Sequence, residues 1–250
     1  MYNFALLISL YIAHIAFDFY LQPKAWIEAR NTLHYKSKKL YLHSLLQGGI
    51  TFIILVLITE ISFGSIFIYS VTVLITHYLF DLGKSYTDNS LRWFITDQAL
   101  HLFVITFLWI ILIDQNTQIF HDLSFKNINY KYLIVILAYI IILKPISILI
   151  YMLLKKWTPV AEEGSTLVSA GQSIGYLERM LILTFILLNQ FAAIGFLLAA
   201  KSIFRFGELQ NDQDKKLTEY VMLGTLISFS ISILTGLATT HLVTQLPIGK

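Results

Sequence analysis

The sequence predicts an all-α protein that crosses a membrane several times, as a polytopic helical bundle of about seven transmembrane helices. Of its 250 residues, 56% are hydrophobic and only 13% are charged, whereas a soluble domain carries about 25% charged residues. The apolar residues gather in seven stretches, each close to the ~20 residues that a helix needs to cross the hydrocarbon core. These stretches are too long and too evenly apolar for strands, which excludes a β-fold.

The seven stretches define the expected spans, which cover residues 4–22, 40–59, 65–83, 94–113, 131–154, 178–204 and 219–244. The first span could be mistaken for a signal peptide, but it lacks a basic start and a small-residue cleavage site. In the fifth span, Lys144 and Pro145 predict a kink, because proline has no N–H for a helical hydrogen bond. The link over residues 23–39 is expected to be partly helical.

A polar link over residues 114–130 indicates that the chain has two parts. We expect residues 1–113 to form a four-helix transmembrane bundle around a His/Asp pocket. Residues 114–250 are then expected to form an accessory bundle of about three transmembrane helices.

Basic residues concentrate in the first link, and this asymmetry predicts the orientation of the chain. Basic residues in short loops stay on the cytoplasmic side of a membrane. The N-terminus is therefore expected outside, in a multi-pass protein of the bacterial cytoplasmic (inner) membrane. The small formal net charge of +3 gives no reason to expect a nucleic-acid partner. The basic residues of the link are Lys24, Arg30, Lys36, Lys38 and Lys39.

The strongest functional signal is a repeated pairing of His and Asp four residues apart within the spans. Four residues are slightly more than one α-helical turn, so both members of a pair lie on one helix face. Ionisable groups cost roughly 2.5–3.5 kcal/mol each near the bilayer centre, so their presence indicates function. The pairs are His14 with Asp18, His77 with Asp81, and Asp97 with His101, and His43 lies at the start of the second span.

The positions of these residues along their spans predict that they meet. Successive spans run in opposite directions, so the end of one span lies level with the start of the next. The pair of span one lies in its second half, and His43 opens span two. The second pair lies near the end of span three, and the third pair opens span four. All seven therefore fall toward the predicted cytoplasmic side. A single intramembrane His or Asp usually bonds to a neighbouring helix, but three pairs at one depth favour a metal or proton site.

The chemistry of the ligands narrows the choice of ion. The chain has no cysteine, which excludes thiolate metal sites, disulfides and cysteine nucleophiles. Imidazole and carboxylate ligands suit a divalent metal, with zinc first and manganese or iron as alternatives. Seven ligand-type side chains exceed what one tetrahedral ion needs, so we expect one or two ions. The predicted metal ligands are His14, Asp18, His43, His77, Asp81, Asp97 and His101.

Catalytic and substrate-binding candidates lie among and beside these ligands. A two-metal site would bind a phosphoryl group and lower the pKa of a bound water toward ~7. One of Asp18, Asp81 and Asp97, if it is not committed to metal, would act as the general base. The candidates for holding an anionic headgroup are Gln22, Lys24, Lys84 and Gln98.

Two other patterns are weaker. Residues 171–175 match the Gly-x-Ser-x-Gly nucleophile elbow, which requires a strand, a tight turn and a helix. Here the pattern falls in the link over residues 155–177, so a role for its glycines in a turn or a helix start is favoured. His34, His121 and His241 fall in or near links and are expected to be ordinary exposed residues.

A stripe of small residues recurs every four positions along the last span. Small residues at that spacing let helices approach closely, which favours a packing seam and leaves open a partner helix or a homo-oligomer at the same place. The charged residues near the ends of spans six and seven could reach the surface, pair across helices or bind lipid phosphate. The stripe is formed by Gly224, Ser228, Ser232 and Gly236, and the charged residues are Glu178, Arg179, Lys201, Arg205 and Glu219.

Four motifs in order carry a resemblance to a known family over residues 1–112: His14 and Asp18 followed by Gln22; Leu42, His43 and Ser44; His77 and Asp81 with Lys84; and Asp97, Gln98 and His101. The chain resembles an uncharacterised family of bacterial membrane proteins that carries only a domain-of-unknown-function label. The remainder resembles the C-terminal extension of longer members. In its His and Asp layout the family is distantly similar to YdjM-like membrane-bound metal-dependent hydrolases, a resemblance that implies hydrolase chemistry.

Three functions are consistent with these observations. The first is a metal-dependent hydrolase that acts on a membrane lipid or other interfacial phosphoester, with the membrane lipid as its partner. The second is an ion-coupled or proton-coupled transporter or channel that uses the same polar residues. Its polar path would have to continue through the bilayer, and spans one to four carry little at their opposite ends beyond Thr59, Glu60 and Asp114. The third is a non-enzymatic membrane component with a structural metal.

Overall fold

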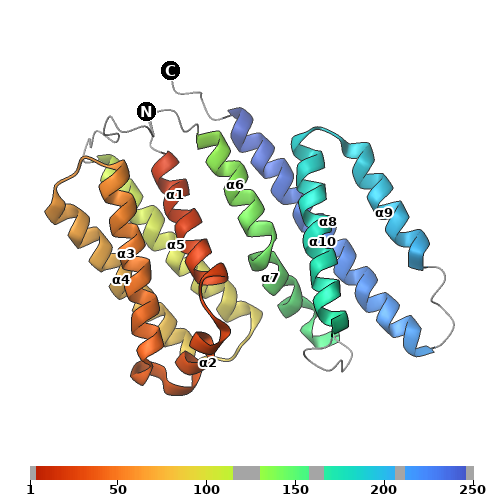
Figure 1. Ribbon diagram of the computed structural model, residues 1–250, viewed down its shortest axis with the longest axis horizontal. Coiled ribbons are helices and arrows are strands. Elements are labelled where there is room, and N and C mark those ends of the chain that lie inside the picture. The colour runs from red at the N-terminus through yellow and green to blue at the C-terminus, as the bar shows by residue number, and fades with distance from the viewer. Residues whose placement is uncertain (1–3, 115–129, 158–165, 206–211, 246–250) are drawn as a thin grey trace. The chain divides into compact units, whose positions relative to one another are not determined.

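The computed structural model describes residues 4–114, 130–157, 166–205 and 212–245. Within these ranges the regular structure is entirely helical, and no strand occurs (Figure 1). The predicted all-α class is therefore confirmed. Contacts divide the chain into two compact units, Met1–Leu137 (unit 1) and Ala138–Lys250 (unit 2). Most of the expected linker, over 115–129, lies outside the described residues, and the predicted domain limits stay a prediction.

Four long helices build the core of unit 1: α1 (Phe4–Ile15), α3 (Lys38–Ile58), α4 (Phe63–Ser85) and α5 (Leu91–Asp114). Helix α1 packs against α3 and α5, and α4 packs against the same two helices, which closes a four-helix bundle (Figure 1). The Ser62 hydroxyl caps α4 by accepting a hydrogen bond from the Ser65 N–H at 3.2 Å. One apolar core runs through the bundle, formed by Leu6, Leu10, Leu55, Ile66, Tyr69, Val73, Ile105, Leu108 and Leu112.

The first span ends in a sharp bend. Helix α1 continues into one π-helical turn, Ala16–Tyr20, and the chain then enters α2 (Lys24–Leu33) and a 3-10 turn, His34–Lys36. The two helical segments on either side of the bend lie at 81° to each other. Pro23 marks the start of α2, as expected from its fixed extended geometry before a helix. The predicted partly helical link is thus largely helical, and α2 packs against α3 and α4.

The helices long and apolar enough to cross a membrane confirm a polytopic architecture. Five helices pass by length and composition, and the bent pair Phe4–Tyr20 with Lys24–Lys36 makes a sixth candidate among the described residues. The five are Lys38–Ile58, Phe63–Ser85, Leu91–Ile113, Tyr130–Leu154 and Glu219–Gln245. Six of the seven predicted spans therefore have a structural counterpart.

Unit 2 is built from the end of α6 (Tyr130–Ile142), α7 (Lys144–Leu154), α8 (Thr166–Leu187), α9 (Phe191–Arg205) and α10 (Asp212–Gln245). Helix α10 packs against α7 and α8, and α9 packs against α8. The predicted kink is present, because helical structure breaks at Leu143 and restarts with Pro145 in the first turn of α7.

The predicted sixth span over residues 178–204 is wrong. The chain turns back between α8 and α9 (Figure 1). Asn189 adopts a positive φ of 58°, and two hydrogen bonds close the end of α8, from the Asn189 N–H to the Ile186 carbonyl and from the Gln190 N–H to the Phe185 carbonyl. This is the Schellman arrangement that ends helices. A uniformly apolar stretch therefore hides a reversal of direction.

Helix α8 also corrects the predicted link over 155–177, because it begins at Thr166. Residues 171–175 lie inside this helix, so the strand and tight turn that a nucleophile elbow needs are missing there. The glycines of the pattern are helical residues.

The small-residue stripe of α10 packs against this chain's own helices. A Cβ at Gly236 would lie 2.6 Å from Ile186 Cδ1 of α8, and one at Gly224 would lie 3.1 Å from Leu154 Cδ1 of α7. Ser228 and Ser232 between them are buried. The stripe is therefore a packing seam within unit 2, while a homo-oligomer or a partner helix stays a prediction.

Candidate metal centre

The seven predicted ligands meet near one end of the unit 1 bundle. Six of them are at most 5% exposed, and the Asp18 side chain is 9% exposed. The predicted common depth agrees with the fold, because every His/Asp pair lies toward the same end of the four-helix bundle. His14 comes from α1, Asp18 from the π-helical turn, His43 from α3, His77 and Asp81 from α4, and Asp97 and His101 from α5.

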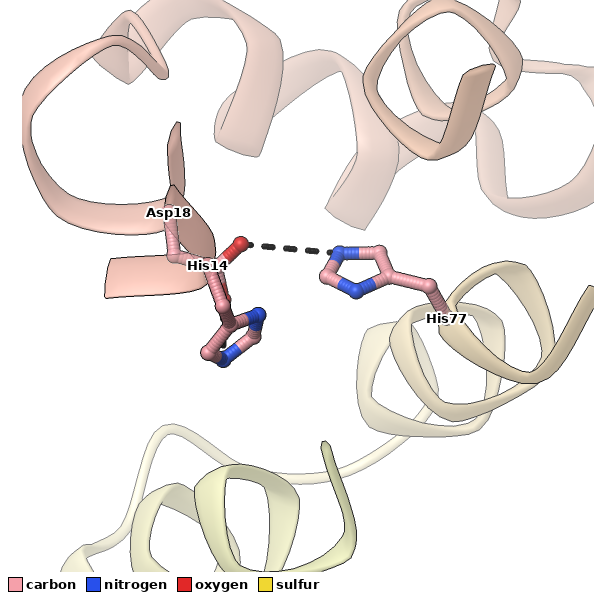
Figure 2. Close-up of side chains that lie close together, drawn as sticks. All are labelled: His14, Asp18 and His77. Atoms are coloured by element: carbon pink, nitrogen blue, oxygen red, sulfur yellow. Dashed lines mark ion pairs between the residues drawn. The ribbon is translucent and has the colours of Figure 1, made fainter. Parts of the chain in front are cut away.

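The first group of potential ligands is His14, Asp18 and His77. Asp18 Oδ2 lies 3.6 Å from His14 Nε2, and Asp18 Oδ1 lies 3.5 Å from His77 Nε2. Figure 2 shows the carboxylate facing the His77 ring. The π-helical turn that carries Asp18 is closed by a 3.0 Å hydrogen bond from the Leu21 N–H to the Ala16 carbonyl, five residues back. Such turns are rare and often occur at functional sites.

The second group is His43, His77 and Asp81. The Nε2 atoms of the two imidazoles face each other at 3.0 Å. Asp81 Oδ2 lies 3.9 Å from His43 Nε2 and 3.8 Å from His77 Nε2. Two facing imidazole nitrogens either share one proton in a hydrogen bond or direct both lone pairs at one cation. At a tetrahedral zinc ion, two such nitrogens would lie about 3.3 Å apart, close to the separation found.

The third group is Asp81, Asp97 and His101. Asp97 Oδ1 lies 3.4 Å from His101 Nε2 on the same face of α5. The His101 ring stacks on the His77 ring with centroids 4.1 Å apart. This stacking joins the third group to the other two.

Four buried polar atoms at this centre have no hydrogen-bond partner among the described residues. They are His14 Nε2, Asp81 Oδ2, Asp97 Oδ1 and His101 Nε2. Elsewhere in the described part of the bundle only Ser37 Oγ, at the start of α3, is buried without a partner, whereas the hydroxyls of Ser44, Thr51 and Ser70 bond to carbonyls four residues back. An unsatisfied buried polar atom costs about 1–3 kcal/mol. Four of them in one cluster fit a site that could hold a cation.

The three groups of potential ligands share residues, and this sharing limits the number of ions that the centre could hold. His77 belongs to the first and second groups, and Asp81 to the second and third. The ligand atoms of each group lie within 4.8 Å of one another, whereas atoms bound to one tetrahedral zinc ion lie about 3.3–3.6 Å apart. Small side-chain movements therefore allow one ion, or two ions that share His77 or Asp81. The residues that could hold a metal are thus the seven that the sequence predicted.

Two amides hold Asp18 in place. Gln47 Nε2 donates to Asp18 Oδ1 at 2.6 Å, and Gln98 Nε2 donates to Asp18 Oδ2 at 3.3 Å and to Asp97 Oδ2 at 3.1 Å. Such outer contacts orient metal ligands. Sequence reasoning missed Gln47, although its position four residues after His43 places it on the same face of α3.

Arg30 of α2 also reaches the centre, and sequence reasoning missed this contact. Its Nη1 donates to Asp81 Oδ1 at 2.6 Å, and the residue is only 5% exposed. The signal lay in the helical spacing, because Arg30 follows Trp26 and Ile27 by four and three residues on the half-buried face of α2.

The four predicted substrate-binding residues lie at different distances from the ligands. Lys84 Nζ donates to Asp97 Oδ2 at 2.5 Å, and Gln98 contacts Asp18 and Asp97. Gln22 is half-buried and Lys24 is exposed at the start of α2. Neither makes a side-chain hydrogen bond or ion pair with the described residues, so their role in substrate binding stays a prediction.

His34 differs from the exposed residue that was predicted. It is half-buried, its Nδ1 lies 3.0 Å from Ser85 Oγ, and its ring stacks on Tyr86 at 4.1 Å between centroids. Its positive φ of 49° places the ring against the end of α4. His241 is exposed on α10 as predicted, and His121 lies outside the described residues.

Comparison with known proteins yields one family. A family model described as "Protein of unknown function (DUF3307)" matches residues 6–130, which is half of the chain and includes all seven ligands. This match confirms the predicted resemblance to an uncharacterised family, whereas the distant similarity to YdjM-like hydrolases stays a prediction. No curated protein and no solved structure matches the chain.

Proposed function

The chain belongs to the DUF3307 family, whose function is unknown, and we propose that it is a divalent-metal-dependent hydrolase embedded in the membrane. The observation that carries the proposal is the cluster of four buried atoms without hydrogen-bond partners at the His/Asp centre. Two are imidazole nitrogens and two are carboxylate oxygens, the donor types of metal sites without thiolate. Zinc fits this set best, with manganese or iron as alternatives.

The roles of the three aspartates follow from their contacts. Asp81 and Asp97 each have one buried oxygen without a hydrogen bond among the described residues, which favours these two as ligands. Asp18 accepts hydrogen bonds from two amides, which orients its carboxylate for work as a general base. A bound ion would supply Lewis acidity and a nucleophilic water near neutral pH.

The position of the centre favours an interfacial substrate. The ligands lie near one end of membrane-crossing helices, on the side where the basic first link lies. A lipid or other interfacial phosphoester is therefore the substrate that we propose. We also retain the predicted location in a bacterial cytoplasmic membrane with the N-terminus outside. Reporter fusions at the N-terminus and in the first link test that orientation, because the two must report opposite sides.

A transporter or channel has less support. A conduit needs polar groups that continue across the bilayer. The described core beyond the centre is mainly apolar, with Leu10, Ile66 and Leu108, and the buried hydroxyls of Thr51 and Ser70 bond to backbone carbonyls. The ionisable groups thus gather at one end of the bundle, which favours a site reached from one side.

Metal analysis tests the proposal directly. After gentle purification without chelator, we expect the chain to hold at least one equivalent of zinc, manganese or iron, and less than about half an equivalent would refute the metal site. We expect Asp81→Asn to lower metal content and hydrolysis together. Asp88→Asn removes an exposed carboxylate between α4 and α5 and should change neither. Metal bound at full occupancy without hydrolysis of phosphate or carboxylate esters would instead support a structural metal.

A further inference from the structure

Two cations lie against the aspartates of the third ligand group, and they come from two different helices. Arg30 of α2 bonds to Asp81, and Lys84 of α4 bonds to Asp97. Both contacts are also ion pairs, at 2.6 and 2.5 Å. Each carboxylate of this group therefore has one oxygen without a hydrogen bond among the described residues and another oxygen that holds a cation.

Both cations have donors beyond these bonds. A guanidinium carries five N–H donors, and the described hydrogen bonds of Arg30 use only its Nη1, to Asp81, and its Nε, to Asn31. Lys84 has three ammonium donors, of which one is used by Asp97, and its side chain is 22% exposed. A planar guanidinium fork and an ammonium are the two groups that proteins use to bind phosphate oxygens.

The charge of the centre selects among anions. With neutral imidazoles, Asp18, Asp81 and Asp97 carry one negative charge more than Arg30 and Lys84 balance. One divalent ion makes the centre positive, and a second adds two further charges. With one ion the centre carries one positive charge, which a phosphodiester would neutralise. With two ions it carries three, and a terminal phosphate group with two negative charges neutralises these better than a phosphodiester, which has only one. A terminal phosphate therefore fits the two-ion centre that the shared ligand groups allow.

Resting on the proposed hydrolase function, we propose that Arg30 and Lys84 bind the non-bridging oxygens of a terminal phosphate, so that the substrate is a phosphomonoester. Water adds to phosphorus and the phosphorus–oxygen bond to the alcohol breaks. The hydroxyl of the water stays on the phosphate, and its second proton ends on the departing alcohol. The two cations stabilise the negative charge that develops on the phosphate oxygens.

Inorganic phosphate is the probe for this site. We expect the metal-loaded, detergent-solubilised chain to bind phosphate in calorimetric titration. Compared in samples brought to equal metal content, Arg30→Gln and Lys84→Gln should each weaken phosphate binding about 10- to 100-fold, the loss of one charge-assisted hydrogen bond. Arg30→Lys keeps the charge and should restore part of the affinity. Arg92→Gln removes an exposed guanidinium of α5 and is the matched control. If Arg30→Gln does not fold, phosphate binding by Lys84→Gln and Arg30→Lys still tests the inference.

Assays with different substrates show whether the phosphate group comes from a lipid or from a soluble ester. They also distinguish failure of this inference from failure of the hydrolase proposal. Hydrolysis of phosphatidic acid in vesicles but not of p-nitrophenyl phosphate supports a lipid monoester, and hydrolysis of both supports the shared monoester chemistry. Faster hydrolysis of bis(p-nitrophenyl) phosphate, or phosphate binding unchanged in both Gln variants, overturns this inference. A metal-loaded chain that cleaves p-nitrophenyl acetate and does not bind phosphate overturns it too, but leaves the hydrolase. A metal-free chain that still binds phosphate through Arg30 and Lys84 overturns the hydrolase and keeps the anion site.

Discussion

Removal of metal from the purified chain is expected to destabilise unit 1, and the structure supplies the size of the effect. The four unpartnered atoms of His14, Asp81, Asp97 and His101 together cost on the order of 4–12 kcal/mol in the metal-free fold. An ion that binds these atoms offsets much of that cost. Held with a dissociation constant one-hundredth of its free concentration, one ion stabilises the fold by about 2.7 kcal/mol. For a chain of this size, that corresponds to roughly 5–10 °C in the unfolding temperature.

Tryptophan fluorescence during heating measures this difference, because three of the four tryptophans, Trp26, Trp93 and Trp109, belong to unit 1. The detergent-solubilised chain is first chelated, then titrated with zinc, manganese or iron. We expect the unfolding temperature to fall on chelation and to recover with the ion that fits. The control is His241→Ala, which removes an exposed imidazole of unit 2 and should leave the metal response intact.

A leucine substitution tests the same reasoning in the metal-free protein, where removal of an unpartnered atom should stabilise the fold. His14→Leu removes one unpartnered nitrogen and one ligand, so the metal-free variant should be more stable than the metal-free parent. Its response to metal should shrink or vanish. Two results would refute the view that the four atoms are metal ligands. One is an unfolding temperature of the parent that chelation leaves unchanged, and the other is a metal-free protein that His14→Leu destabilises.

Three packing predictions can be checked by thermal unfolding. Gly48→Ala should destabilise by about 1–3 kcal/mol, because its methyl would lie 2.8 Å from a side-chain carbon and 3.0 Å from a backbone oxygen of α4. Gly49→Ala meets no described atom within 4 Å and should stabilise by up to about 1 kcal/mol, so equal effects would contradict the α3–α4 contact. Asn189→Val should cost about 1–2 kcal/mol at its positive φ, and a cost as large for Asn189→Gly would contradict the turn. Arg179→Leu should lower the free energy of unfolding by about 3 kcal/mol or more. The reason is that Arg179 Nε donates to the Ile142 carbonyl at 2.6 Å and its Nη1 donates to Ser228 Oγ at 3.2 Å. An unchanged unfolding temperature would show that these bonds do not stabilise unit 2.

The ligands could be predicted because their signal is local and because the membrane makes it stand out. A His and an Asp four residues apart share a helix face whatever the helix packs against. Alternating spans then fix the depth of each pair without knowledge of the packing. These two rules alone predict that His14, Asp81 and His101, from three helices, lie close together.

The features that could not be predicted from the sequence depend on where the backbone bends or reverses. Hydropathy measures composition, and it reads the stretch around Asn189 as one span although the backbone reverses there. The contact between Arg30 and Asp81 depends on the 81° bend after the first span, and no local rule specifies that angle. The π-helical turn under Asp18 is likewise a product of packing, because its residues are compatible with an ordinary helix.

The surroundings of the centre determine how a substrate reaches it. On one side lies the apolar core of unit 1, through which neither water nor a charged group passes at low cost. The ligands themselves are at most 9% exposed, and Arg30 closes over Asp81. Lys84, at 22%, is the most exposed of the charged groups that touch the centre among the described residues. A reacting group must therefore approach past Lys84, at the end of α4 and next to the basic first link. That approach suits a charged headgroup held at the membrane surface, since an acyl chain would have to leave the lipid to enter by this path.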